Sequence, residues 1–324
     1  MMTCRICGNL ENNCEFRVRE MQFGTREEFV YFQCNVCGCL QIAEIPSDMS
    51  KYYPSDDYYS IQPLDERKYS GLRGFFRVLP LEACLFPNSP LRWALSRLVS
   101  KTHFSSLRDV GVHRGTKVLD VGCGNGKSLL YPLKRMGLEE VAGCDPFIPE
   151  DIRYSNGLTI SAKNITEMNG NANWNVITFH HSFEHIPNPI DTVKAVSRLL
   201  TGDGLCLIRI PTSSSFAWQH YGVNWVQLDA PRHLFLHSVD SIRRLAGSAN
   251  LRLVKVAYDS NYFQFWGSEN YIKGIPLKDQ KKGKGFRKIV WIFRRGLLNQ
   301  KARRLNRESR GDQAAFVLMK AASR

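Results

Sequence analysis

The sequence has no long, uninterrupted apolar run. No window of about 18 apolar residues occurs in its 324 residues, and a helix needs that length to cross a bilayer. The first ten residues, MMTCRICGNL, also lack the charged segment and the apolar stretch that begin a secretory signal peptide. We therefore expect a cytoplasmic protein whose ten cysteines stay reduced, so that paired cysteines indicate metal binding or catalysis and not disulfides.

Acidic residues are scarce in two segments only. The chain has 44 Lys and Arg residues against 30 Asp and Glu, a net charge of +14. Residues 271–310 have fourteen basic and two acidic side chains, residues 67–108 have eight and one, and the rest has a net charge of −5. This distribution excludes a uniformly basic nucleic-acid-binding body. It predicts two attachments that face a membrane surface, a polyphosphate carrier or RNA.

Four cysteines occur as two CxxC pairs separated by 26 residues: Cys4, Cys7, Cys34 and Cys37. Two such pairs, each followed by glycine, are typical of a zinc ribbon, in which four thiolates hold a structural Zn²⁺ with no open position. A redox pair is the alternative, but two pairs within forty residues favour zinc. We expect a zinc ribbon over residues 1–44, with a strand at 28–33, and a helical connector over residues 45–108.

The centre of the chain predicts a nucleotide-binding type of α/β fold. A strand beginning at Lys117 runs into the glycines at 122, 124 and 126, a helix follows from Lys127 to Gly137, and a second strand ends at Asp145. A dinucleotide fingerprint would require glycine in place of Lys127, and a Walker A loop would require glycine in place of Val121. Neither phosphate-binding motif is therefore present. The glycine turn followed by Asp145 fits a cofactor that contains adenosine but no phosphate group.

This pattern resembles the class I S-adenosylmethionine-dependent methyltransferases. The similarity includes Asp120 before the GxGxG turn, Asp145, and the run EHIPNP at 184–189, which resembles the turn after that family's fourth strand. It implies a Rossmann-like, seven-stranded methyltransferase domain over residues 109–324, with the basic segment at about 271–310 inserted before the last strand. An N-terminal CxxC module and a PRHLF segment, here at 231–235, are similar to those of sugar- and glycan-modifying methyltransferases.

The resemblance also implies which residues bind the cofactor. The glycine turn would admit the methionine moiety, Asp120 would order the turn or approach the ammonium group, and Asp145 would hold the ribose hydroxyls. Asn164 matches the position that contacts the adenine amino group. The implied cofactor-binding residues are Asp120, Gly122, Gly124, Asn125, Gly126, Asp145, Asn164 and His180.

Histidine is the natural base for methyl transfer to a hydroxyl or a carbon acid, because its pKa lies near 7. His233 aligns with the base of sugar C-methyltransferases, but Arg232 replaces the glutamate that precedes it there. This replacement argues against deprotonation of a carbon, so that O-methylation is favoured over C-methylation, and it favours an anionic group on the substrate. His181, Glu184 and His185 also resemble the E-x-x-E-H run that binds a divalent ion in ubiquinone-biosynthesis O-methyltransferases. The candidate catalytic residues are His181, Glu184, His185 and His233.

Two further segments allow alternative interpretations. Trp218, Tyr221 and Trp225 can line a sugar site or pack in the core. Residues 281–298 mix basic and apolar side chains, as in a helix lying on the inner face of an anionic membrane or capping its own domain.

The sequence thus predicts a methyltransferase acting on a nucleotide-sugar or a cell-surface glycan precursor, in polysaccharide biosynthesis. The alternative is an RNA ribose methyltransferase that grips RNA with its ribbon and basic insertion, although the strand-four segment lacks the (D/N)PP(Y/F) signature of exocyclic-amine methylation.

Overall fold

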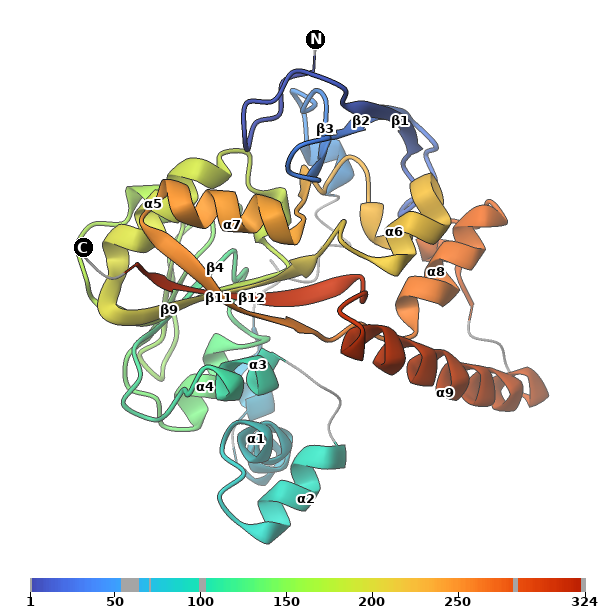
Figure 1. Ribbon diagram of the computed structural model, residues 1–324. Helices are drawn as coiled ribbons and strands as arrows, with labels where there is room; N and C mark the ends of the chain where they lie inside the picture. The colour runs from blue at the N-terminus through green and yellow to red at the C-terminus, as the bar shows by residue number, and fades with distance from the viewer. Residues whose placement is uncertain (1, 54–63, 70, 99–102, 282–284, 322–324) are drawn as a thin grey trace.

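The computed structural model describes residues 2–53, 64–69, 71–98, 103–281 and 285–321, and contains an eight-stranded and a four-stranded sheet (Figure 1). The larger sheet has the strand order β11-β12-β9-β8-β4-β5-β7-β6. Its strands are β4 Val118–Val121, β5 Val141–Cys144, β6 Ile152–Arg153, β7 Thr159–Ser161, β8 Trp174–His180, β9 Leu200–Pro211, β11 Leu251–Tyr258 and β12 Gln313–Lys320.

The five central strands β9, β8, β4, β5 and β7 run parallel, and β12 is antiparallel to both its neighbours. All four residues of β4 are buried because helices cover both faces of the sheet. This mixed sheet confirms the predicted Rossmann-like methyltransferase fold. The short hairpin of β6 with β7 adds an eighth strand to the seven that were expected.

Helices cover the two faces of the sheet (Figure 1). Helices α5 (Pro189–Leu199) and α7 (Val239–Ser248) lie on one face, where Val193, Val196, Leu199, Ile242 and Leu245 are buried. Helices α3 (His103–Asp109) and α4 (Leu130–Arg135) lie on the other. The carboxyl ends of the parallel strands are therefore left to the loops that carry the candidate site.

The smaller sheet combines strands of the N-terminal cysteine-rich segment with one strand of the predicted methyltransferase domain. It contains β1 (Cys14–Arg19), β2 (Glu28–Gln33) and β3 (Leu40–Ile42), and its fourth strand is β10 (Phe235–Leu236), which pairs antiparallel with β3. One hydrophobic core includes Tyr31 from the cysteine-rich segment (residues 1–44, called the ribbon below). The same core includes Trp225 and Phe265 from the second half of the chain. The cysteine-rich segment is thus packed into the methyltransferase region.

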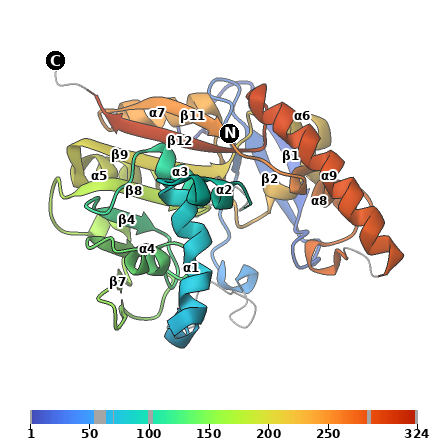
Figure 2. The same cartoon turned by 90° about the horizontal axis from the view of Figure 1, so that it is seen from below.

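The remaining helices project from this body. Helices α1 (Gly71–Leu85) and α2 (Pro90–Leu98) lie in the connector, and α6 (Phe216–Tyr221), α8 (Phe263–Ile272) and α9 (Phe286–Arg307) follow β9 or β11. Figure 2, seen from below, has α1, α2 and α9 on the near side of the molecule. Among the residues that the structure describes, no helix combines the length and the hydropathy needed to cross a bilayer.

Candidate functional site

The glycine-rich turn follows β4 in a backbone conformation that glycine favours. Gly122, Gly124 and Gly126 have φ values of 71°, 55° and 70°. A Cβ atom on Gly122 would lie 2.4 Å from the Cβ of Ser182, and one on Gly126 would lie 2.7 Å from Ile160. The turn therefore brings its backbone close to the segment after β8, as a site that receives a ligand over the end of β4 requires.

Asp145 follows β5 and closes the turn from the neighbouring strand. Its two carboxylate oxygens accept hydrogen bonds from the backbone N–H of Gly124 at 2.7 Å and of Phe147 at 2.9 Å. Burial raises the pKa of Asp145 above its usual value, and these two bonds oppose that rise. Each carboxylate oxygen keeps a lone pair that can accept a further hydrogen bond, so the two oxygens fit the two hydroxyl donors of a ribose diol. Buried Asn125 supports the same turn, because its side-chain oxygen accepts the Lys127 N–H at 3.0 Å.

Asp120 lies within β4, two residues before the first glycine of the turn. Its carboxylate is buried and accepts a hydrogen bond from the Thr178 hydroxyl at 2.7 Å. Burial raises the pKa of Asp120 to about 7, against the lowering effect of the Thr178 bond. A cationic group arriving at this position would stabilise the ionised carboxylate.

Asn164 and His180, the other two predicted cofactor contacts, have different surroundings in the structure. Asn164 is exposed and lies three residues beyond β7, at the same edge of the sheet as Asp145, whose N–H donates to Ser161. His180 ends β8, and its ring lies 4.5 Å, centroid to centroid, from the ring of His103 in α3. Burial lowers the pKa of His103 to about 3 and that of His180 well below its usual value. His180 therefore packs as a neutral imidazole against α3.

The candidate catalytic residues gather around the carboxylate of Glu184. This side chain is fully buried in the short 3-10 helix Phe183–His185, and neither of its oxygens has a hydrogen-bond partner among the described residues. The Nδ1 atom of His181 lies 3.5 Å away and the Nε2 atom of His233 lies 3.8 Å away. Burial would raise the pKa of Glu184, but the contact with His181 and the nearby imidazoles of His185 and His233 lower it to about 2.

Backbone and side-chain contacts orient the imidazoles. The Nδ1 atoms of His233 and His185 lie 2.7 Å from the Gln227 carbonyl and 2.8 Å from the Arg232 carbonyl, so each carries a donated hydrogen. The Nε2 atom of His233 consequently keeps its lone pair. Burial lowers the pKa of His233 to about 4, although the charges of Asp229 and Glu184 raise it. A neutral imidazole flanked by carboxylates can accept a proton and have its charge stabilised.

The same cluster can hold a cation. Ligand atoms of Glu184, His185 and His233 all lie within 4.8 Å of one another. Histidines that donate their other ring N–H to a carbonyl are typical of divalent metal ligands, as are buried carboxylates. The geometry therefore fits a histidine base and a divalent ion, but the ion's ligands would include His233 in place of the predicted His181.

Sequence reasoning missed Asp229 and assigned a different role to Arg232. The Asp229 carboxylate lies 3.7 Å from the Nε2 atom of His233, and its backbone is left-handed, with a φ of 44°. The Arg232 guanidinium is buried and paired with Asp229, so the charge of Arg232 is already neutralised. Carboxylates from Asp229 and Glu184 thus stand beside His233 although no glutamate precedes it. The only signal was an acid four residues before the histidine.

An aromatic side chain connects the two halves of the site. The ring of Tyr53 stacks on Phe147, two residues after Asp145, with 6.0 Å between centroids. The same ring lies edge-on to His185, with 6.3 Å between centroids, and the Tyr53 hydroxyl lies 3.3 Å from the His185 Nδ1 atom. The turn for the cofactor and the histidine cluster are therefore adjacent. Tyr58 and Tyr59, which belong to the same expected connector (residues 45–108), lie outside the described residues.

The aromatic residues predicted either to line a sugar site or to pack in the core are buried. The indole N–H of Trp225 donates to Asp312 at 3.1 Å, and that of Trp218 donates to Gln33 at 3.1 Å. Tyr221 is buried in the same core. These three residues pack the second half of the chain against the ribbon.

The four predicted metal ligands converge. The sulfur atoms of Cys4 and Cys37 are 3.6 Å apart and those of Cys7 and Cys34 are 3.5 Å apart, and all four lie within 4.8 Å of one another. Tetrahedral Zn²⁺ with bonds of about 2.3 Å separates its sulfur ligands by about 3.8 Å. The Gln41 side-chain N–H donates to the Cys4 sulfur at 3.2 Å, as partners of metal thiolates do. The donor set therefore fits one zinc ion.

The cysteine-rich segment also holds the strand that follows His233. The Tyr31 hydroxyl is buried and donates to the His233 carbonyl at 2.8 Å. The Ile42 N–H donates to the Leu234 carbonyl at 3.0 Å, next to the β3–β10 pairing. The position of the candidate base therefore depends on the ribbon.

Comparisons with known proteins agree with this geometry. Residues 91–256 match a family described as a methyltransferase domain. Among curated proteins, demethylmenaquinone methyltransferase of Staphylococcus aureus is 28% identical over 108 residues, which are 31% of this chain and 44% of that protein. The matched region thus spans less than half of the length of that relative.

Solved structures show similarity at low sequence identity. A putative sarcosine dimethylglycine methyltransferase from Galdieria sulphuraria is 15% identical, with a TM-score of 0.42 over 67% of this chain and 83% of that one. The 1,6-didemethyltoxoflavin-N1-methyltransferase of Burkholderia thailandensis, solved with S-adenosylhomocysteine, is 12% identical, with a TM-score of 0.40 over 90% and 96%. Because the family match covers half of the chain, the chain belongs to the methyltransferase domain family.

Proposed function

We propose that the protein methylates a hydroxyl group of a sugar, in a nucleotide-sugar or a cell-surface glycan precursor. The observation that carries the proposal is the buried cluster of Glu184, His185, His233 and Asp229, which adjoins the cofactor turn through Tyr53. Such a set of imidazoles and carboxylates recognises hydroxyl groups by hydrogen bonding. A sugar acceptor would fit this chemistry better than an apolar acceptor.

In this proposal, the cofactor binds at the turn of Gly122, Gly124 and Gly126, with Asp145 on its ribose and Asp120 near its ammonium group. S-adenosylmethionine supplies an electrophilic methyl group on a sulfonium. The Nε2 atom of His233 accepts the proton of the acceptor hydroxyl, and Glu184 and Asp229 stabilise the resulting imidazolium. His185 and His181 orient Glu184.

The cysteine-rich segment would bind zinc for a structural purpose. All four sulfur atoms would be used by the metal, which leaves no position for a substrate. A zinc-bound ribbon would fix β3 and Tyr31, and through them the segment that carries His233.

The alternative, an RNA ribose methyltransferase, receives less support. Residues 1–44 have four Arg and no Lys against six Glu, so the ribbon is net acidic and unsuited to phosphates. Its edge strand β3 is already paired with β10. Only the two basic segments, 67–108 and 271–310, would remain to bind RNA.

A membrane-associated acceptor would explain the basic insertion at about 271–310. Residues 281–298 would contact the anionic inner face of a membrane, with the enzyme on the cytoplasmic side. Residues 282–284 of this range lie outside the described residues, and α9 begins at Phe286. A glycan precursor carried on a lipid would be presented at that surface.

Calorimetric titration with S-adenosylmethionine is the first test, repeated with Asp145→Ala. We expect micromolar binding by the intact protein and at least a tenfold loss in the variant, because the ribose diol loses its acceptor. Labelled-methyl transfer to nucleotide-sugars, lipid-linked glycans and RNA then identifies the acceptor. His233→Gln should keep cofactor binding and lose transfer by roughly 100-fold or more. Transfer to RNA alone would overturn the sugar proposal.

A further inference from the structure

Exposed apolar side chains are concentrated on three helices. Among the described residues, ten of the sixteen exposed large apolar side chains lie on α1, α2 and α9. They are Leu72, Phe75, Phe76, Leu91 and Trp93 on α1 and α2, and Ile289, Val290, Ile292, Phe293 and Leu297 on α9. Single exposed apolar residues are ordinary, whereas contiguous groups mark interaction surfaces.

Helix α9 has two distinct faces. Its inner face packs against the domain, with Ala302 and Leu305 buried and the Trp291 ring 5.1 Å from that of Trp266. At 100° per residue, Ile289 and Phe293 lie on the opposite face. Phe293 is 73% exposed and Leu297 is 68% exposed. The apolar outer face therefore has no partner among the described residues.

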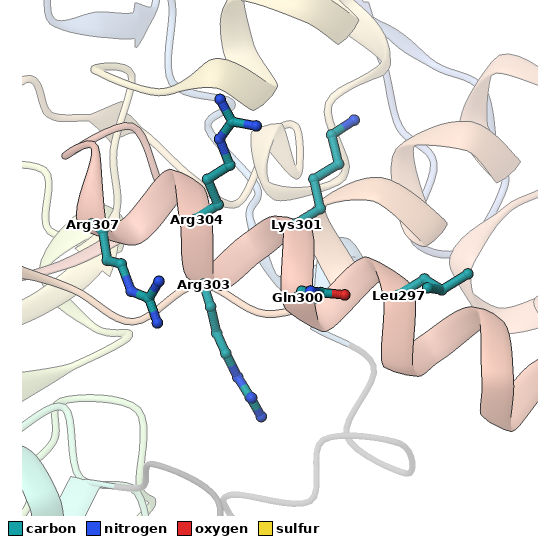
Figure 3. A pocket seen from close by; sticks show the side chains of 6 residues that line it. All are labelled: Leu297, Gln300, Lys301, Arg303, Arg304 and Arg307. Atoms are coloured by element: carbon teal, nitrogen blue, oxygen red, sulfur yellow. The ribbon is translucent and has the colours of Figure 1, made fainter.

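The outer face of α9 becomes basic toward its C-terminal half. A groove there begins at Leu297 and is otherwise lined by polar and basic side chains: Leu297, Gln300, Lys301, Arg303, Arg304 and Arg307 (Figure 3). Figure 3 shows Arg303 and Arg307 pointing to the opposite side of the helix from Lys301 and Arg304. Arg304 pairs with Glu308, whereas Arg303 and Arg307 form no ion pair among the described residues. The apolar stripe thus lies beside two unpaired guanidinium groups, as in helices that lie on anionic membranes.

Helix α1 repeats this arrangement independently. Gly74 and Val78 are buried on its inner face, whereas Leu72 and Phe76 lie on the opposite face and are 77% and 67% exposed. Arg73 and Arg77 are exposed beside them. The two segments that contain α1, α2 and α9 are also the two segments that hold the whole positive excess of the chain.

The two basic and apolar segments face the same side of the molecule. Figure 1 shows α1, α2 and α9 below the large sheet, and Figure 2, seen from below, shows α1 and α2 in front of that sheet and α9 beside it, on the near side of the molecule. Segments separated by about 200 residues in sequence therefore contribute to one face.

We propose that α1, α2 and α9 form one docking face for the surface of an anionic lipid bilayer. The exposed apolar stripes would enter the region between headgroups and acyl chains, and the flanking arginines would contact anionic headgroups. Phosphates of RNA would use the arginines but leave the apolar stripes in water. A second copy of the chain would present the same positive charge. This inference concerns binding alone and does not depend on which acceptor is methylated.

Vesicle flotation with the full-length, zinc-loaded protein tests the proposal. We expect binding to phosphatidylglycerol–phosphatidylethanolamine vesicles at low salt and none to phosphatidylcholine vesicles. Raising the salt concentration to about 1 M should release the charge-dependent part of the binding. Binding of equal strength to both vesicle types, or to neither, would overturn the proposal.

Paired variants separate the contributions of the helices. Phe293→Ser with Leu297→Ser on α9, and Leu72→Ser with Phe76→Ser on α1, should each weaken vesicle binding at least roughly tenfold. Arg303→Gln with Arg307→Gln should weaken binding to anionic vesicles by roughly 30-fold at low salt.

A matched control changes two apolar side chains elsewhere. Leu10→Ser with Val36→Ser removes exposed apolar residues from the ribbon and should leave vesicle binding unchanged. Every variant should bind S-adenosylmethionine like the parent, which separates docking from folding and from the catalytic proposal. If only the α9 pair matters, the single face is wrong. RNA binding or concentration-dependent dimerisation without vesicle binding would identify another occupant and overturn the proposal.

Discussion

Asp120 shows how a single buried side chain makes the stability of the fold depend on pH. Its pKa is raised from the ordinary value near 4 to about 7 because the carboxyl group is buried in β4. Between these two values the folded state keeps a proton that the unfolded state has lost. Unfolding then releases a proton, so the free energy of unfolding falls as the pH rises from about 4 to about 7, and the loss persists above that range.

We therefore expect Asp120→Asn to stabilise the ligand-free protein above pH 7 and to have little effect near pH 4. The expected gain at pH 8 is on the order of 4 kcal/mol, because a pKa shift of about three units is worth about 1.4 kcal/mol per unit. The asparagine oxygen can still accept the Thr178 hydrogen bond. Urea unfolding from pH 5 to pH 8, with exposed Asp203→Asn as the control, measures the difference. An equal effect at both pH values would show that Asp120 does not hold the proton.

The limits of sequence reasoning are clear at this scale. The GxGxG spacing located the turn, and the CxxC spacing placed four cysteines whose sulfur atoms converge in the structure. Asp229 was missed because its role depends on a left-handed backbone and a contact across a loop. No periodic pattern in the sequence encodes such a contact.

At the scale of elements, the strands followed from their apolar runs, and β2 has the predicted bounds of 28–33. Helix α4 begins at Leu130 and not at Lys127, because the Asn125 side chain binds the Lys127 N–H and prolongs the turn. Strand β10 was not predicted. It has two residues, pairs with a strand almost 200 residues away, and therefore has no local signal.

The pairing of β3 with β10 makes Tyr31 a positioning residue for His233. Tyr31→Phe removes the hydroxyl that donates to the His233 carbonyl and leaves this buried acceptor unpaired. We expect a loss of about 1–3 kcal/mol in the free energy of unfolding and a several-fold fall in kcat, with cofactor affinity unchanged. Urea unfolding and single-turnover transfer to the accepted substrate measure both effects.

Tyr271→Phe is the matched control for this prediction. Tyr271 is buried in the same core, but its hydroxyl has no hydrogen-bond partner among the described residues. Removing that hydroxyl should leave stability unchanged or raise it. Equal losses in the two variants would show that the Tyr31 hydrogen bond does not position the candidate base.

At the scale of the whole molecule, the ribbon and the methyltransferase region share one core. The Ser213 hydroxyl donates to the Gly38 carbonyl at 2.8 Å, and the Ser238 hydroxyl donates to the carbonyl of Cys37, a proposed zinc ligand. The sheet that contains β1, β2 and β3 is completed by β10. Loss of the metal should therefore affect the region beyond the ribbon.

We accordingly expect zinc removal by a chelator to lower the Tm of the whole protein by roughly 10 °C in a single transition, because the metal's binding energy contributes to folding. Differential scanning calorimetry and tryptophan fluorescence should report the same midpoint, since Trp218 and Trp225 lie in the shared core. Restoring zinc should restore that midpoint. An early transition of the ribbon alone, followed by melting at the original temperature, would show that the two regions fold independently and that Tyr31 cannot connect the metal to His233.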